Sequence, residues 1–159
     1  MIRVGLGFDL HPVTADRPLL LGGVQVPAEF GLGGHSDADV LAHAVAEALL
    51  GALALGDLGR HFPDTDPRYR GIASLVLLRR VVELLGARGG RIANVDATVL
   101  AEAPRLAPFL PEMARRLADA MGLPVESVSV KAKNPEGLGL LGRREGIAAM
   151  AVVGVEVPP

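Results

Sequence analysis

Histidine and aspartate residues cluster near the amino terminus in a spacing that predicts a metal site. All four histidines lie within the first 61 residues. Asp9 and His11 are separated by one residue, and alternate side chains of an extended strand share a face, about 7 Å apart along the strand. His43 is the best candidate for a third ligand. Two imidazoles and a carboxylate suit zinc with a fourth position open, as in catalytic rather than structural sites.

Simpler interpretations of the same residues remain open. A lone Asp-x-His at a strand end is usually a solvated turn. His35, at the entrance to a helix, is also compatible with a capping role, and His43 in an alanine-rich helix with a satisfied interior histidine. The presence of a second histidine and aspartate cluster, at residues 35–43, favours the metal site.

Two elements have to position these residues. Ile2, Val4, Leu6, Phe8 and Leu10 alternate with Arg3, Gly5, Gly7, Asp9 and His11, which predicts a strand that buries its apolar face and presents ligands on the other. A helix is expected from about Asp37 to Leu55 with Ser36 as its cap. Asp39, His43 and Glu47 then share one stripe of that helix.

The rest of the chain alternates strand and helix signals, which predicts a single α/β domain over residues 1–159. The expected elements are a hairpin at 19–27, helices at about 73–85 and 108–121, and strands at 95–101, 127–133 and 147–157. Residues 56–67 are rich in turn formers and acids and predict a functional loop. Residues 133–146 are glycine-rich and charged, a composition suited to phosphate binding but also to a mobile connection.

Composition restricts the function classes. Cysteine is absent, so nitrogen and oxygen must hold any transition metal, and a cytoplasmic location is expected. A net charge of −2 argues against nucleic-acid binding. The amino terminus is unlike a signal peptide, and the longest apolar stretch, 40–55, is shorter than the ~20 residues of a membrane span. Hydrophobic content of 50% with only 3% aromatics suggests that other subunits cover some apolar surface.

Five ordered motifs together resemble the 2-C-methyl-D-erythritol 2,4-cyclodiphosphate synthase family of the non-mevalonate isoprenoid pathway. They are Gly-Phe-Asp-Leu-His at 7–11, Gly-His-Ser-Asp-Ala-Asp-Val at 34–40, Gly-Asp-Leu-Gly at 56–59, Phe-Pro-Asp-Thr-Asp-Pro at 62–67 and Gly-Arg-Arg-Glu-Gly at 142–146. The resemblance covers essentially the whole chain. It implies an α+β two-layer fold, with a mixed four-stranded sheet packed on helices, and a homotrimer with active sites between neighbouring subunits.

The resemblance also implies roles for individual residues. Asp9, His11 and His43 match zinc ligands, and Glu136 matches the ligand of a second ion, Mg²⁺ or Mn²⁺. His35 and Asn134 match catalytic positions beside the transferred phosphate. The matched substrate-binding positions are Asp9, Leu10, His11, His35, Ser36, Asp57, Leu58, Gly59, Phe62, Pro63, Asp64, Thr65, Asp66, Ala101, Arg105, Leu106, Ala107, Lys133, Asn134, Pro135, Glu136, Leu140 and Arg143. The sets at 101–107 and 133–136 would come from the neighbouring subunit and hold the cytidine.

The implied reaction is an intramolecular phosphoryl transfer. The 2-phosphate of 4-diphosphocytidyl-2-C-methyl-D-erythritol 2-phosphate attacks the β-phosphate, closes a cyclic diphosphate and expels CMP. Two departures stand out: Asn134 replaces a common threonine, and Leu140 replaces a frequent aromatic residue. Arg143 is equally compatible with an ion pair to Glu145 in the trimer's central channel. A zinc hydrolase and a non-catalytic trimeric metal and nucleotide binder remain the alternative functions.

Overall fold

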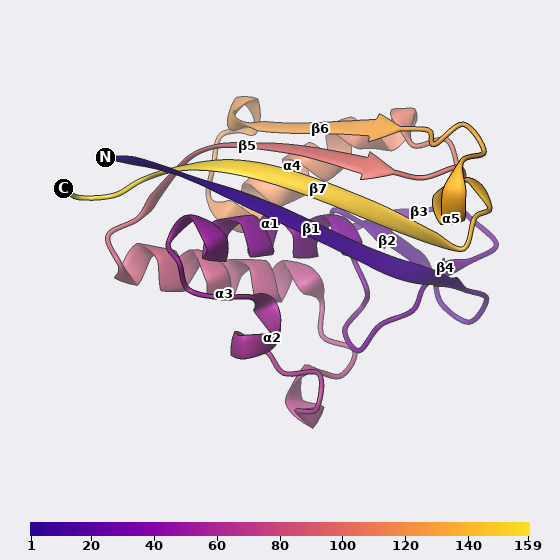
Figure 1. Ribbon diagram of the computed structural model, residues 1–159, viewed down its shortest axis with the longest axis horizontal. Coiled ribbons are helices and arrows are strands. Elements are labelled where there is room, and N and C mark those ends of the chain that lie inside the picture. Colours follow the sequence, from indigo (N-terminus) through magenta and orange to yellow (C-terminus); the bar gives the residue numbers. More distant parts are fainter.

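The computed structural model describes residues 1–159 and contains a five-stranded mixed sheet with helices over one face (Figure 1). The strand order is β4-β1-β7-β5-β6, and every neighbouring pair is antiparallel except β5 and β6. The strands are β1 (Ile2–Thr14), β4 (Gly31–Leu32), β5 (Arg91–Leu100), β6 (Val128–Lys133) and β7 (Gly146–Glu156). A separate hairpin is formed by β2 (Leu19–Leu21) and β3 (Val24–Val26).

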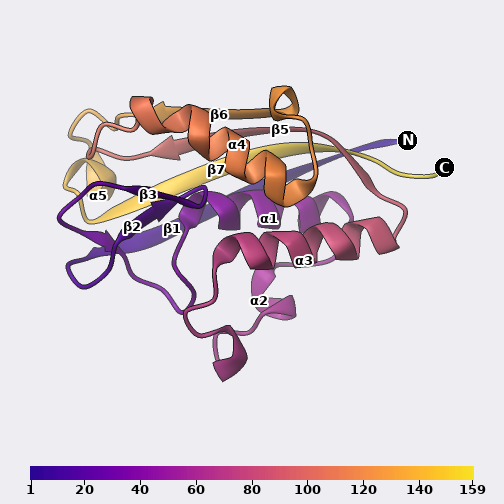
Figure 2. The same cartoon turned by 180° about the vertical axis from the view of Figure 1, so that it is seen from behind.

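The long helices are α1 (Val40–Ala52), α3 (Ser74–Ala87) and α4 (Leu110–Met121). In Figure 2, α1 and α4 lie against the sheet, and α3 packs against both helices. Short helices α2 (Leu58–His61) and α5 (Gly139–Gly142) and 3₁₀ turns at Pro67–Tyr69, Ala107–Phe109 and Val125–Ser127 occupy the connections. None of these helices has the length and apolar character required to cross a membrane.

The mixed α/β architecture was predicted correctly, but the strand count and one helix cap were not. A fifth strand exists because the two residues of β4 pair with Val13 and Thr14 at the end of β1. Helix α1 begins at Val40, since its N-cap is Asp39 rather than Ser36. The Asp39 carboxylate accepts the Ala42 N–H at 3.0 Å.

The side chain of Asp39 also points away from the stripe that it was predicted to share with His43 and Glu47. Its side chain is fully buried and accepts the N–H groups of Gly22 and Gly23 at 2.8 and 2.6 Å. One carboxylate therefore both caps α1 and fixes the turn between β2 and β3. Of the predicted stripe, only His43 and Glu47 line the cavity described below.

The packing of β1 on α1 reverses the predicted burial of this strand. The buried row contains Gly5 and Gly7, because the backbone of α1 lies directly against them. A Cβ on Gly5 would lie 1.8 Å from the Ala48 carbonyl oxygen, and one on Gly7 would lie 1.9 Å from that of Ala44. No side chain fits there. The row that faces the helix layer continues into Asp9 and His11.

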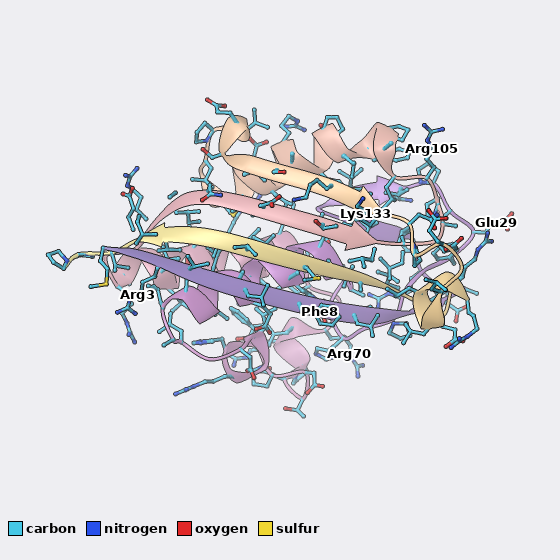
Figure 3. The ribbon with its side chains drawn as sticks, turned by 45° about the horizontal axis from the view of Figure 1, so that its top comes forward. Arg3, Phe8, Glu29, Arg70, Arg105 and Lys133 are labelled. Carbon is cyan, nitrogen blue, oxygen red and sulfur yellow. The ribbon has the colours of Figure 1, made fainter.

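The apolar row of β1 consequently points away from the helices. Its exposed members, with those of β7, are Ile2, Val4, Leu6, Phe8, Leu10, Met150 and Val152, which we term the apolar strip. Phe8 lies opposite Met150 and Leu6 opposite Val152 across the β1–β7 pair. Figure 3 shows this uncovered face, with Phe8 on β1. A contiguous apolar surface of this kind marks an interaction site.

Gly7→Ala is expected to lower the free energy of unfolding by about 3 kcal/mol, because the new methyl group must push β1 away from α1. Chemical denaturation measures this change. Gly86→Ala is the matched control: its Cβ meets no atom within 4 Å in helix α3, so it should be neutral or stabilise by up to about 1 kcal/mol. Equal stability of the two variants would refute the packing argument.

Candidate metal centre and active site

Asp9, His11 and His43 bring three potential ligand atoms together at the end of β1. Asp9 Oδ2 lies 2.8 Å from His11 Nε2 and 2.9 Å from His43 Nδ1. The two imidazole nitrogens are 3.1 Å apart. Strand β1 supplies two of these side chains, and α1 supplies the third across the glycine contact. These are the three residues that the sequence predicted as a metal site.

Hydrogen bonds to neighbouring backbone groups leave lone pairs of Asp9 and His11 directed toward the centre of the cluster. His11 Nδ1 lies 2.7 Å from the carbonyl oxygen of Gly33, which only accepts, so Nδ1 carries the hydrogen and Nε2 faces the cluster with its lone pair. Asp9 Oδ1 accepts the Leu10 N–H at 2.9 Å, which leaves Oδ2 for the cluster. Converging acceptors repel unless a cation lies among them. Two nitrogens and one oxygen in this arrangement fit Zn²⁺.

The titration behaviour of the cluster agrees with its geometry. Burial disfavours the charged form of Asp9. When no ion is bound and the His11 and His43 rings are protonated, their hydrogen bonds and charges outweigh burial and hold the Asp9 pKa far below its ordinary value. Burial alone would lower the pKa of His11, yet the hydrogen bond and charge of Asp9 raise it above 6.5. Asp9 therefore stays ionised and attracts positive charge at neutral pH.

The three-residue cluster opens into a cavity of about 480 Å³. Among the predicted substrate contacts, His35, Ser36, Leu58, Gly59, Phe62 and Asp64 line it. Gly34, Glu47, Tyr69 and Leu77 also line it, although none of them was predicted as a site residue. Glu47 carried a signal, because it lies one helical turn beyond His43. Gly34 belongs to the motif at 34–40, whereas Tyr69 and Leu77 lie in segments whose sequence contains no pattern for a site.

Arg17 and Asp66 fix the segment that carries His35. The Arg17 guanidinium donates to the carbonyl oxygens of Gly34 and Ser36, one on each side of His35. His35 Nε2 donates to the Asp66 carbonyl oxygen at 3.1 Å. The imidazole is thus held at the cavity wall. Arg17 was not predicted, since it is distant in sequence from the motif that it stabilises.

The rim of the cavity is held by Glu47 and by an aromatic contact. Glu47 accepts the Leu58 N–H at 3.0 Å, and burial raises the pKa of this carboxyl group. Phe62 meets Tyr69 edge to face, with ring centroids 5.4 Å apart. The Arg80 guanidinium lies 5.8 Å from the centre of the Tyr69 ring. These contacts join α2 and the 62–69 segment to α1 and α3.

Several predicted contact residues of this region do not line the cavity. Asp57 caps α2 by accepting the Arg60 N–H at 2.9 Å. Leu10 lies on the opposite face of β1, in the apolar strip. Pro63, Thr65 and Asp66 belong to the rim loop, and the Asp66 carboxylate pairs with Arg68 at 2.6 Å. The strand and loop geometry directs these side chains elsewhere.

The remaining predicted residues form a second group at the opposite edge of the sheet. They lie at or just beyond the ends of β5 and β6, and they are Ala101, Arg105, Leu106, Ala107, Lys133, Asn134, Pro135 and Glu136. The Ala101 N–H donates to the Lys133 carbonyl oxygen at 3.1 Å, and Asn134 Nδ2 lies 3.4 Å from that of Glu102. Figure 3 shows Arg105 and Lys133 at this edge. Strands β1 and β6 are three strand spacings apart, about 14 Å, so one chain keeps the two groups separate.

Leu140 and Arg143 occupy a third location, near the carboxyl-terminal end of β1. Leu140 lines an apolar depression with Phe8, Leu10 and Leu138 on the uncovered side of the sheet. The Arg143 guanidinium donates to Glu145 at 2.6 Å, so the ion pair considered as an alternative is present.

Comparison with known proteins gives a consistent family relationship. The YgbB family model matches residues 2–156. The chain is 59% identical over 152 residues to the 2-C-methyl-D-erythritol 2,4-cyclodiphosphate synthase of Syntrophobacter fumaroxidans, covering 96% of each protein. A CDP-bound structure of a synthase of the same name has a TM-score of 0.89 and 38% identity, covering 97% of this chain and 100% of the other. The bifunctional IspDF of Campylobacter jejuni has a TM-score of 0.96 and 39% identity, covering 99% of this chain and 43% of the longer one.

Proposed function

Because the chain belongs to the YgbB family, we propose that it forms 2-C-methyl-D-erythritol 2,4-cyclodiphosphate in isoprenoid biosynthesis. The substrate is 4-diphosphocytidyl-2-C-methyl-D-erythritol 2-phosphate, and CMP is released, which makes the protein a lyase. The observation that carries the proposal at the site is the convergence of Asp9, His11 and His43 at the wall of a cavity that also contains His35 and Ser36. The cysteine-free composition supports a cytoplasmic location.

The reaction requires no protein nucleophile. An oxygen of the 2-phosphate forms a bond to the β-phosphorus, and the bond from that phosphorus to the bridging oxygen breaks, so that the oxygen leaves with CMP. Catalysis consists of holding two anionic groups together and stabilising the charge that develops. The hydroxyl of Ser36 is placed to donate to phosphate oxygens. The Nε2 hydrogen of His35 goes to the Asp66 carbonyl oxygen, so His35 would donate to phosphate through Nδ1 in the protonated form of its ring.

Asp9, His11 and His43 would hold Zn²⁺, and Glu136 would provide a carboxylate for Mg²⁺ or Mn²⁺. When bound, these ions supply Lewis acidity and charge neutralisation at the phosphates. Glu47 and the Phe62–Tyr69 contact keep the cavity rim in place around the methylerythritol end. We assign the cytidine to the group at 101–107 and 133–136, with Asn134 as the amide donor near the transferred phosphate.

A homotrimer would complete the active site. The metal cluster and the group at the ends of β5 and β6 lie toward opposite edges of the sheet, which supports an arrangement in which a neighbouring chain supplies one of them to a shared ligand. The apolar strip supplies a surface for that association, because its side chains are exposed in the single chain. Leu10, Leu140 and Arg143 would then act from the region near the trimer axis rather than from the cavity of one chain.

Phosphorus NMR of the purified protein with substrate, Zn²⁺ and Mg²⁺ tests the activity. We expect signals of the cyclic diphosphate and of CMP, and His43→Ala should reduce their rate of appearance by about 10²–10³-fold or more because it removes a ligand atom. His61→Ala is the matched control: its ring bonds to the Leu55 carbonyl oxygen at 2.9 Å outside the cavity lining, so turnover should persist.

The same spectra separate the alternative functions. Free phosphate or diphosphocytidyl-methylerythritol in place of the cyclic product would identify a hydrolase. An unchanged substrate spectrum with intact binding would identify a metal and nucleotide binder without turnover. Either result would overturn the proposed synthase activity.

Leu6→Glu tests the trimer, because it places a charge in the middle of the apolar strip. Light scattering after gel filtration should give the mass of three chains for the wild type and a smaller mass for the variant, which should also lose turnover. Val125→Glu is the matched control, since Val125 is 48% exposed in a 3₁₀ turn outside the strip. A wild-type monomer, or an intact trimer of Leu6→Glu, would contradict this assembly.

A further inference from the structure

The outer nitrogen of His43 lies against a buried serine that is tied to a carboxylate. His43 Nε2 is 2.8 Å from Ser74 Oγ, and Ser74 is 1% exposed at the first residue of α3. The Ser74 hydroxyl contacts Asp37 Oδ1, and the Ser74 N–H donates to Asp37 Oδ2 at 3.0 Å. Neither Ser74 nor Asp37 was among the predicted site residues, and neither lines the cavity.

The chemistry of these groups fixes the direction of each hydrogen bond. An ionised carboxylate only accepts, so the single hydroxyl hydrogen of Ser74 goes to Asp37. Ser74 Oγ can then only accept from His43, which places a hydrogen on Nε2. The lone pair of the imidazole is left on Nδ1, the atom that faces Asp9 and His11.

A second hydroxyl near the same nitrogen lacks this support. Ser36 Oγ is 3.1 Å from His43 Nε2 and accepts the Ala38 N–H at 3.2 Å. The Asp37 carboxylate accepts the Ser74 N–H at the start of α3 and the Asp39 N–H at 3.2 Å. These two hydrogen bonds fix its orientation. Of the two hydroxyls beside His43 Nε2, only that of Ser74 is bonded directly to a carboxylate.

We propose that Asp37 and Ser74 are positioning residues that hold His43 with its Nδ1 lone pair directed at the metal. Carboxylates that orient metal-bound histidines raise ligand basicity and metal affinity, and here the serine hydroxyl is interposed. The arrangement also connects the metal centre to the first residue of α3. This helix follows the 62–69 rim segment in the chain. This inference rests on the metal site proposed above.

Metal binding without substrate tests the relay. Metal-stripped protein is titrated with Co²⁺, followed by its visible absorption, and with Zn²⁺ in competition with a chromophoric chelator. Ser74→Ala and Asp37→Asn should each weaken Zn²⁺ binding by about tenfold to a hundredfold. In the double variant, Asp37→Asn should add little to Ser74→Ala, because the carboxylate acts through the hydroxyl.

Ser36→Ala is the matched control, because it removes a hydroxyl at a comparable distance from the same nitrogen and should affect Zn²⁺ affinity much less. Nitrogen NMR of histidine-labelled, metal-free protein provides a second measurement. His43 should carry its hydrogen on Nε2 in the wild type and lose that preference in Ser74→Ala.

Three outcomes would overturn the relay while leaving the metal centre intact. They are wild-type affinity in Ser74→Ala, an equal loss in Ser36→Ala, or full additivity in the double variant. A wild-type protein that binds neither Co²⁺ nor Zn²⁺ would remove the metal centre itself, and the relay with it.

Discussion

The close contact between the glycines of β1 and the backbone of α1 determines the rest of this structure. With Gly5 and Gly7 against the carbonyls of Ala48 and Ala44, strand and helix approach so closely that their polar side chains meet one turn further along. Asp9 and His11 then reach His43 within hydrogen-bonding distance. Bulkier residues at positions 5 and 7 would separate β1 from α1. Asp9 and His11 would then stay together, but the His43 imidazole would be too distant to join them.

The same contact explains why the other face of the sheet is apolar and exposed. If the glycine row is inside, the apolar row of β1 must be outside, and β7 extends it with Met150 and Val152. The sheet also separates the metal cluster on β1 from the group beyond β5 and β6 by three strand spacings. In the trimer that we propose, burial of the apolar strip and completion of the active site would be two results of one association between copies of the chain.

Sequence reasoning predicted the cluster of Asp9, His11 and His43 and most elements because those depend on local patterns. Asp9 and His11 share a face in any extended strand, and the helices carry clear apolar periodicity. It chose the wrong buried face of β1, since alternation defines two rows but not which one a helix covers. The choice of Asp39 over Ser36 as the cap depended on the distant turn at Gly22 and Gly23. Ser74 and Arg17 were missed because only folding brings them to the histidines.

The most direct test of this account is anomalous diffraction at the zinc edge from crystals of the protein grown with Zn²⁺. The account predicts one peak per chain about 2.0–2.2 Å from His11 Nε2, His43 Nδ1 and Asp9 Oδ2. A peak bound through His43 Nε2, or zinc bound only elsewhere in the chain, would contradict it. Either result would mean that the contact between β1 and α1 does not build a metal centre.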